Sequence, residues 1–270
     1  VESDCVVLDC RFQLDQPAWG ESAYAEGHIP GACYARLDRD LSARPSAVEG
    51  RHPLPAFTDW SARLAAWGIG ADTQVVAYDD QGGVYAARLW WMLRWAGHRR
   101  VAVLNGGLRA WRAAGGAMST AVAHRPPAAP GIRVASPGAT VSTGRICAFV
   151  ERTDPELILL DARSARRYRG EEEPYDRIGG HVPGAISRPC TDNLSEDGLF
   201  LPADSLRARF LPCLGGRSPE AVVHMCGSGV SACHNLLAME HAGLGGSRLY
   251  VGSWSAWCGD PARPVATGDG

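Results

Sequence analysis

The sequence predicts an α/β protein built from two copies of one parallel-sheet unit. Short apolar segments of strand length alternate with helical stretches along the chain, which is typical of parallel sheets covered by helices on both faces. Motifs of the first half return in the same order in the second half, and a duplication explains this better than chance does. At 270 residues, the chain has room for two domains of ordinary size.

Six apolar segments are expected to form the strands, three in each half. They cover residues 6–9, 75–78, 101–104, 157–161, 222–225 and 248–251. The Trp-rich stretch 89–95 carries an arginine, so it is predicted to be a buried helix rather than a membrane span. Residues 231–243 have the periodicity of an amphipathic helix.

Four pairs of motifs define the repeat. They are VLDCR at 7–11 with LLDAR at 159–163, GHIPGA at 27–32 with GHVPGA at 180–185, VVAYD at 75–79 with VVHMC at 222–226, and VLNGGLRAW at 103–111 with LYVGSWSAW at 249–257. Residues 115–138 are rich in Pro, Ala and Gly without periodicity, which is typical of a linker. We therefore expect a first domain over 1–120, a linker over 121–140 and a second domain over 141–270.

The two halves differ at one position that matters for chemistry. The second half has Cys226 at the end of a strand, whereas the first half has Asp79 there, followed by a loop one residue longer. In open α/β sheets, ligands bind at such strand ends, where backbone N–H groups are left free. We expect one active site per chain, built around Cys226, with the first domain supplying a wall.

The loop after Cys226 suits a reactive thiolate. Its sequence, Cys-Gly-Ser-Gly-Val-Ser, can curl so that backbone N–H groups of Gly227, Gly229 and Val230 form an anion-binding nest at a helix N-terminus. Two hydrogen bonds to a charged acceptor, at about 1.5–3 kcal/mol each, are enough to hold the sulfur as a thiolate without a neighbouring base. A buried core cysteine is the competing interpretation, and the small residues that follow Cys226 disfavour it.

Composition argues against several other classes of protein. The net charge is −2, and all 27 basic residues are arginine, so there is no basic footprint for nucleic acid. The nine cysteines are odd in number and lack a Cys-x-x-Cys pair, which disfavours a disulfide framework or a zinc site and favours reduced thiols in a cytoplasmic enzyme. The absence of an initiator Met leaves open a trimmed start or a removed targeting segment.

Taken as an ordered set, these motifs resemble the two-domain rhodanese-type sulfurtransferases. The tandem repeat, the paired Gly-His-Ile/Val-Pro-Gly-Ala motifs, Asp79 in place of cysteine and the Cys226 loop carry the resemblance, which spans residues 6 to about 268. It implies two tandem rhodanese-like domains and a persulfide on Cys226 that passes sulfur to cyanide, a small thiol or thioredoxin. It implies no metal or organic cofactor.

The resemblance also suggests a sulfur donor. A Cys-Gly-Ser-Gly-Val-Thr loop is typical of 3-mercaptopyruvate sulfurtransferases, and Ser231 stands here in place of that Thr, while thiosulfate-preferring members carry Arg and Lys directly after the cysteine. We therefore expect 3-mercaptopyruvate as the donor. A thiosulfate:cyanide sulfurtransferase and a sulfur carrier without turnover are the alternatives.

Two arginines are candidates for binding the substrate carboxylate. Arg167 lies where the family places a substrate-binding arginine, whereas Arg163 matches Arg11 of the inactive half, which favours a structural role. The family's second substrate arginine lies in a Pro-Glu-Pro-Arg segment. Here the segment reads EPYDR at 173–177, so Arg177 is a candidate with altered spacing.

Proton transfer is assigned to small groups near the thiolate. Ser228 or Ser231 would relay a proton or hold the keto oxygen, and the resemblance suggests that His28 joins the relay. For His28 and His181, however, a role as caps or braces of the turn before Pro-Gly is the favoured interpretation.

A cysteine phosphatase is excluded because it requires His directly before Cys and Arg six residues after it. His224 is displaced by one position and Ala232 occupies the arginine position. Cys233 is expected to pack in the helix.

Overall fold

The computed structural model describes residues 5–129, 136 and 138–269, and part of the expected linker, residues 130–135 and 137, lies outside them. The chain divides into two compact units. The first unit spans residues 1–43, 54–136 and 196–199, and the second spans 44–53, 137–195 and 200–270. Residues 44–53, which come from the first half of the sequence, therefore belong to the second unit, and residues 196–199 of the second half belong to the first unit.

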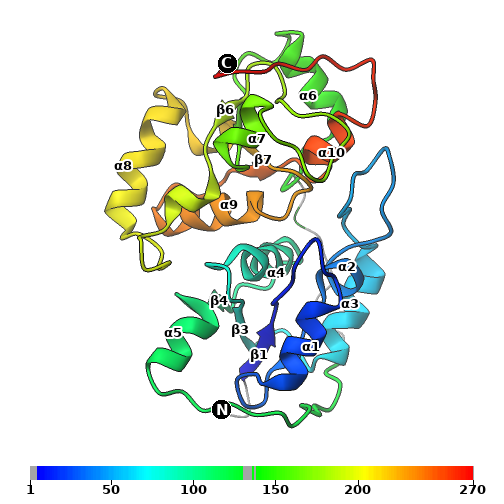
Figure 1. Cartoon of the computed structure of the whole chain (residues 1–270), viewed down its shortest axis with the longest axis vertical. Coiled ribbons are helices and arrows are strands. Elements are labelled where there is room, and N and C mark those ends of the chain that lie inside the picture. The colour runs from blue at the N-terminus through cyan, green and yellow to red at the C-terminus, as the bar shows by residue number, and fades with distance from the viewer. Residues whose placement is uncertain (1–4, 130–135, 137, 270) are drawn as a thin grey trace. The chain divides into compact units, whose positions relative to one another are not determined.

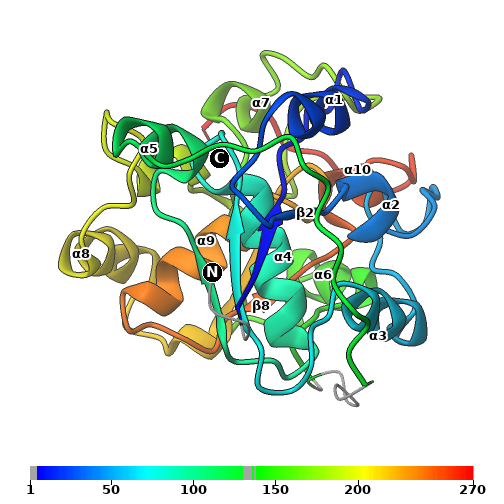
Figure 2. The ribbon, with the colours of Figure 1, turned by 90° about the horizontal axis from the view of Figure 1, so that it is seen from below.

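Each unit contains a four-stranded parallel sheet (Figure 1). In the first unit the strand order is β2-β1-β3-β4, with β1 at Cys5–Asp9, β2 at Cys33–Tyr34, β3 at Gln74–Tyr78 and β4 at Val101–Val103. Its helices are α1 (Trp19–Glu26), α2 (Leu37–Asp40), α3 (Phe57–Ala66), α4 (Val84–Trp95) and α5 (Gly107–Ala113). Figure 2 shows α1 and α5 on one side of β1 and α3 and α4 on the other.

The second unit repeats this topology. Its strand order is β6-β5-β7-β8, with β5 at Ile158–Asp161, β6 at Ile186–Ser187, β7 at Val222–Met225 and β8 at Arg248–Leu249. Its helices are α6 (Thr143–Val150), α7 (Ala165–Arg169), α8 (Ala203–Leu214), α9 (Ala232–His241) and α10 (Ser253–Trp257), with short 3₁₀ turns at Cys190–Asn193 and Pro219–Ala221. The predicted fold class, two parallel-sheet α/β domains, is confirmed.

Strand length explains which strands the sequence revealed. The six predicted strands are all present, with ends that differ by at most two residues. The edge strands β2 and β6, at two residues each, were not predicted because two residues carry no measurable alternation.

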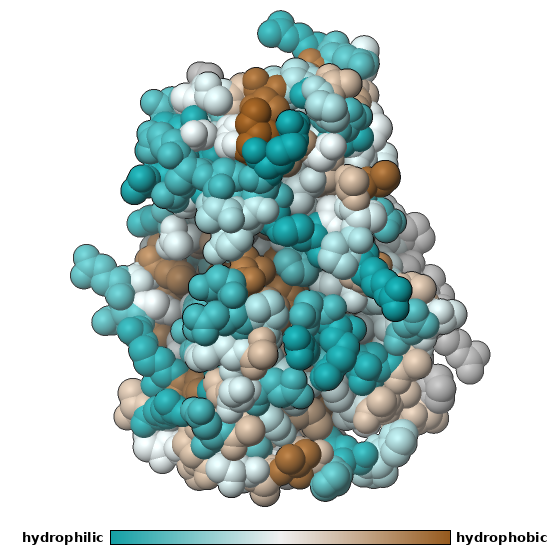
Figure 3. Space-filling model, turned by 45° about the vertical axis from the view of Figure 1, so that its right-hand side comes forward, coloured by the Kyte–Doolittle hydropathy of each residue, from teal (hydrophilic) through white to brown (hydrophobic). Residues whose placement is uncertain are grey.

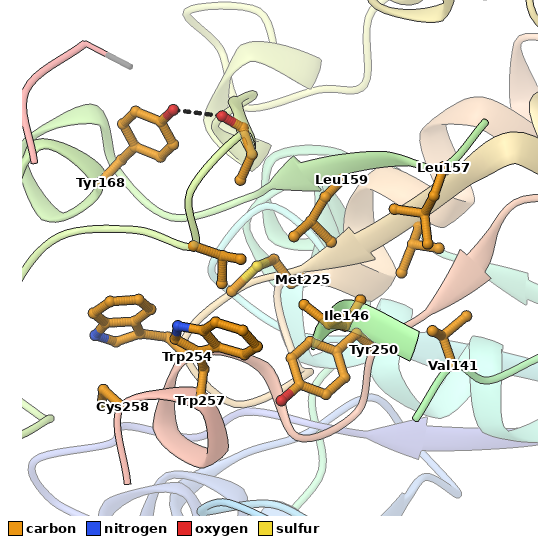
Figure 4. Close-up of a cluster of buried hydrophobic side chains, with 13 residues drawn as sticks. Val141, Ile146, Leu157, Leu159, Tyr168, Met225, Tyr250, Trp254, Trp257 and Cys258 are labelled. Carbon is orange, nitrogen blue, oxygen red and sulfur yellow. Dashed lines mark hydrogen bonds between the residues drawn. The ribbon is translucent and has the colours of Figure 1, made fainter. Parts of the chain in front are cut away.

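The core of the second unit lies on both faces of its sheet, and Figure 4 shows the cluster on one of these faces. Leu159 and Met225 point to one face, where they pack with Trp254 and Trp257 of α10. The opposite face of the same strands meets α8 and α9 through Phe210 and Met239, among others. Strands buried on both faces read as continuous apolar runs, which is why they were visible in the sequence.

The paired Asp-x-Arg motifs form a buried ion pair in each unit. Arg11 contacts Asp9 at 2.6 Å, and Arg163 contacts Asp161 at 2.6 Å. Nη2 of Arg11 also donates to the carbonyl of Gly27, and Nη2 of Arg163 donates to the carbonyl of Gly180. Each of these glycines directly precedes the histidine of the Gly-His motif in its copy. The motif therefore ties the end of the first strand of each unit to the Gly-His turn.

Buried His224 on β7 predicts acid sensitivity of the second unit. Burial, together with the positive charge of Arg188, lowers the pKa of His224 from 6.5 to about 3. The folded state therefore holds His224 neutral, and its stabilising contribution is complete above pH 6.5 and is lost as the pH falls from 6.5 towards 3. At pH 4.5, two pH units below the unfolded-state pKa, the loss is about 3 kcal/mol.

We expect His224→Gln to remove this part of the pH dependence. Urea unfolding at pH 7 and pH 4.5 should show a smaller loss of stability for His224→Gln than for the wild type. The exposed His241 supplies the control, His241→Gln, which should behave as the wild type does. Equal pH dependence in all three proteins would contradict the prediction.

The surface is mostly polar on the face drawn in Figure 3, with small separate hydrophobic patches. In the described part of the chain, none of the helices combines the length and apolar character needed to cross a bilayer.

Candidate active site

Cys226 lies directly after β7, where the chain turns towards α9. Cys226 is 2% exposed, and its backbone is fixed by two hydrogen bonds to the start of α10. Its N–H donates to Oγ of Ser253, and its carbonyl accepts from the N–H of Trp254. The ends of two neighbouring parallel strands thus hold the loop, as the sequence predicted for a strand end.

Gly229 gives the loop its conformation and supplies a donor to the sulfur. Its N–H donates to Sγ of Cys226 at 3.1 Å. Gly229 has φ +78°, and a Cβ there would lie 2.5 Å from the carbonyl oxygen of Val251. Both facts require glycine at this position. Cys233 packs beneath, with its Sγ donating to the Gly229 carbonyl at 3.3 Å.

Ser228 has a histidine partner. Oγ of Ser228 lies 2.7 Å from Nδ1 of His52, and both side chains are buried. His52 belongs to the segment 44–53, which is part of the second unit although it precedes most of the first unit in sequence. The pair joins residues 176 positions apart and provides a path for a proton between a hydroxyl and an imidazole.

Two guanidinium groups lie beside the loop at Gly227. A Cβ on Gly227 would be 3.0 Å from Nη2 of Arg51 and 3.2 Å from Nη2 of Arg167. Arg167, on α7, was predicted. Arg51 was not, because it lies outside the half that carries the cysteine and has no counterpart in the paired motifs.

Two buried carboxylates orient these arginines. Glu173 accepts from Arg167 at 2.7 Å, and Asp176 pairs with Arg51 and lies 3.6 Å from Nη2 of Arg167. Burial raises the pKa of Asp176, while the hydrogen bond from Arg51 lowers it. The ring of Tyr175 lies 5.1 Å from the Arg167 guanidinium. The loop after α7 is therefore built to fix the direction of both cations.

Arg163 has the structural role that its match to Arg11 predicted. Besides Asp161, it contacts Glu173 at 3.4 Å and stacks on Trp254 at 4.6 Å. Burial acts to lower the pKa of Arg163, but Asp161, Glu173 and the charge of Cys226 raise it above its ordinary value.

Two predicted site residues, Arg177 and His28, make hydrogen bonds to backbone carbonyls. Arg177 is exposed and donates to the carbonyl of Cys258 at 3.1 Å. His28 is buried in the first unit, where Nδ1 lies 2.7 Å from the Tyr24 carbonyl and Nε2 lies 3.0 Å from the Ala121 carbonyl. Both ring nitrogens of His28 thus lie within hydrogen-bond distance of backbone carbonyls, which fits a brace of the turn. The histidine beside Ser228 is His52.

The remaining loop residues, Val230 and Ser231, lie at the start of α9. Val230 is buried, and its carbonyl accepts from the N–H of Cys233. Ser231 is the N-cap position of α9 and makes no side-chain cap hydrogen bond.

In the first unit, Asp79 closes the corresponding loop on itself. Its carboxylate accepts four backbone N–H groups, from Gln81, Gly83, Tyr85 and Ala86, at 2.8–3.0 Å. The donors that would face a bound anion or thiolate are used by the protein's own side chain. Within the described residues, no group of three or more His, Cys, Asp or Glu side chains is arranged to hold a metal ion.

Known proteins match both halves of the chain. The family model of the rhodanese-like domain matches residues 1–114 and 149–260. A probable 3-mercaptopyruvate sulfurtransferase of Pseudomonas aeruginosa is 49% identical over 270 residues, covering 99% of this chain and 94% of that protein. A putative thiosulfate sulfurtransferase of Mycobacterium tuberculosis is 39% identical over 262 residues, covering 97% and 90%. The structure of 3-mercaptopyruvate sulfurtransferase from Leishmania major matches with a TM-score of 0.83 and 31% identity, covering 95% of this chain and 71% of that one.

Proposed function

This chain belongs to the rhodanese family, and on that premise we propose that it is a 3-mercaptopyruvate sulfurtransferase that carries sulfur as a persulfide on Cys226. The observation that carries the proposal is the group of side chains around the loop. The guanidinium groups of Arg51 and Arg167 lie at Gly227, and the Ser228–His52 pair lies one residue further along. This arrangement supplies a carboxylate site and a proton path beside one sulfur.

The charge balance at Gly227 favours a donor with a single negative charge. Two arginines face two buried carboxylates, Glu173 and Asp176, so their charges cancel. Mercaptopyruvate adds one negative charge, whereas thiosulfate adds two to a site that is already balanced. Burying an uncompensated charge is costly, so the dianion is the poorer ligand. Arg51 takes the place of the second substrate arginine that we had assigned to Arg177.

In the first half-reaction, the Cys226 thiolate attacks the sulfur of mercaptopyruvate. A sulfur–sulfur bond forms and the carbon–sulfur bond breaks, and its electron pair leaves on the enolate of pyruvate. The thiol proton of the donor ends on the methyl group of pyruvate, so the step needs no external acid. The products are the Cys226 persulfide and pyruvate.

The Ser228–His52 pair moves that proton, since Oγ and Nδ1 are 2.7 Å apart. Ser228 hydrogen-bonds the keto oxygen as its charge develops. Ser231 and the N–H groups of Gly227, Gly229 and Val230 complete the surroundings of the sulfur. No metal or organic cofactor enters the reaction.

In the second half-reaction, an acceptor nucleophile removes the outer sulfur and restores the Cys226 thiolate. Cyanide leaves as thiocyanate, and a small thiol or thioredoxin leaves as its persulfide. All nine cysteines of the chain are free, which suits a reducing compartment such as the cytoplasm.

Steady-state sulfur transfer to cyanide tests the proposal. We expect kcat/KM for 3-mercaptopyruvate to exceed that for thiosulfate by at least about tenfold, the effect of one unfavourable charge. A preference for thiosulfate would make the protein a thiosulfate:cyanide sulfurtransferase, and the charge balance at Gly227 would not set specificity. One persulfide per chain without turnover would make it a sulfur carrier.

The Ser228–His52 pair predicts a donor-dependent mutant effect. His52→Asn should lower kcat with mercaptopyruvate by about 10²-fold, the usual contribution of a positioned proton-transfer group. Thiosulfate needs no proton because it leaves as sulfite, so turnover with thiosulfate should change little. Pyruvate release in a single turnover, before any acceptor is added, measures the affected step.

His241→Asn, on the exposed end of α9, is the matched control and should leave both donors unaffected. Equal losses with both donors in His52→Asn would mean that His52 only supports the shape of the loop.

A further inference from the structure

The first unit contains a cavity with several charged side chains in its lining, and this cavity takes no part in the chemistry proposed above. It has a volume of about 450 Å³ and lies between α1 and α5, near the ends of β1 and β3. Its charged and aromatic lining consists of Arg11, Trp19, Glu26, Asp80, Arg109 and Arg112.

Arg11 lines this cavity, and one nitrogen of its guanidinium group, Nη1, can donate hydrogen bonds to a ligand. The side chain is 4% exposed, and Nε and Nη2 are occupied by Asp9 and the carbonyls of Ala23 and Gly27. Among the described residues, Nη1 has no hydrogen-bond partner. A buried guanidinium nitrogen that lines a cavity and lacks an acceptor is a ready site for an anion.

In the second unit, the corresponding arginine nitrogen has an acceptor. Arg163 makes the same bonds to Asp161 and to the Gly180 carbonyl, and its Nη1 contacts Oε2 of Glu173 at 3.4 Å. Glu173 comes from the loop after α7. In the first unit Gly27 follows α1 directly, so no residue supplies that carboxylate.

Three further differences between the copies open the cavity and make it cationic. In the paired motifs at 103–111 and 249–257, Leu108 stands where Trp254 stacks on Arg163, and Arg109 stands where the other copy has Ser255. One position on, Arg112 corresponds to Cys258. A large ring is thus replaced by a smaller side chain, and two neutral side chains by arginines.

We propose that this cavity binds a small organic monocarboxylate whose oxygens take the place of the Glu173 carboxylate. Nη1 of Arg11 and the exposed guanidinium groups of Arg109 and Arg112 hold the carboxylate. The indole of Trp19 lies against the apolar part of the ligand. Since Arg11 is already paired with Asp9, Asp80 and Glu26 balance the other two arginines, and a dianion such as phosphate is disfavoured.

Calorimetric titration of the full chain with pyruvate tests the proposal. The background is Cys226→Ser with Arg167→Gln, which weakens binding at the Cys226 loop. We expect one site with a dissociation constant on the order of 1 mM or tighter. Arg109→Ser, which installs the residue of the other copy, and Arg112→Gln should each weaken binding by about tenfold, the loss of one charge-assisted hydrogen bond.

Arg99→Gln changes the same charge on an exposed arginine outside the cavity and should bind as the background does. Leu108→Trp provides a second, steric test, because it restores the ring of the other copy and should block binding. Pyruvate binding that survives Arg109→Ser and Arg112→Gln would overturn the proposal. So would equally tight binding of inorganic phosphate at the same ionic strength, since that indicates a non-specific cationic surface.

Discussion

Replacing Cys226 by serine is expected to lower kcat/KM with 3-mercaptopyruvate at least about 10⁴-fold, the scale of effect seen when a covalent nucleophile is removed. Serine is slightly smaller than cysteine, but its hydroxyl can still accept from the Gly229 N–H, which lies 3.1 Å from the sulfur, so the loop should keep its shape. Serine cannot form a persulfide. The first half-reaction therefore stops.

Mass spectrometry after incubation with mercaptopyruvate and no acceptor measures the effect directly. The wild-type chain should gain the mass of one sulfur atom, and Cys226→Ser should gain none. Cys233→Ser and Cys190→Ser are the matched controls. Cys233 is bonded to the Gly229 carbonyl, and burial together with the charge of Cys226 raises the pKa of Cys190 to about 12. Both controls should retain activity and the added sulfur.

Sulfur retained on the Cys226→Ser chain would contradict the assignment. It would place the persulfide on another of the nine thiols.

The sequence revealed the fold because its signals are local and occur twice. Strands buried on both faces appear as apolar runs, and the duplication makes each one recognisable in the other half. The loop after Cys226 was also predictable, because small residues between a strand and a helix leave backbone donors free. The resemblance to tandem rhodanese-type proteins rested on the order of these local signals, and the family match confirms it.

The residues that the sequence did not reveal are those that act across long separations. His52 reaches Ser228 over 176 positions, and Arg51 reaches the loop from the same segment. That segment follows the Gly-His turn of the first copy and carries no repeat motif. In the Pro-rich stretch Arg51-His-Pro-Leu-Pro55, a histidine and an arginine are the only local signal of a site.

His28 was a candidate for the proton relay because it lies in a local motif that occurs in both halves of the chain. It sits in a paired motif, but the pairing with His181 reflects a shared structural task. Each ring stacks on the tyrosine of the preceding helix, at 3.9 Å on Tyr24 and 3.7 Å on Tyr168. In the proposed mechanism, the groups that act on the sulfur donor are those present in one copy only, whereas the paired histidines brace a turn in both copies.

Arg167 is such a one-copy feature, and its replacement by glutamine should have the second largest effect. Two of its nitrogens are held by Glu173, and Nη1 lies 3.3 Å from where a Gly227 Cβ would be, with no hydrogen bond to a described residue. A donor carboxylate at Nη1 would form charge-assisted hydrogen bonds worth about 1.5–3 kcal/mol each. Losing one or two of them should lower kcat/KM for mercaptopyruvate by about 10²-fold.

The loss should appear mainly in KM, because the carboxylate is bound equally before and during sulfur transfer. Arg166→Gln supplies the control, since Arg166 neighbours Arg167 on α7 but is exposed and pairs with Glu171 and Glu172. It should leave KM unchanged. If Arg167→Gln leaves KM unchanged as well, the carboxylate is bound by Arg51 alone. Arg51→Gln would then carry the whole effect, and the Glu173–Arg167 pair would serve only to hold the loop after α7.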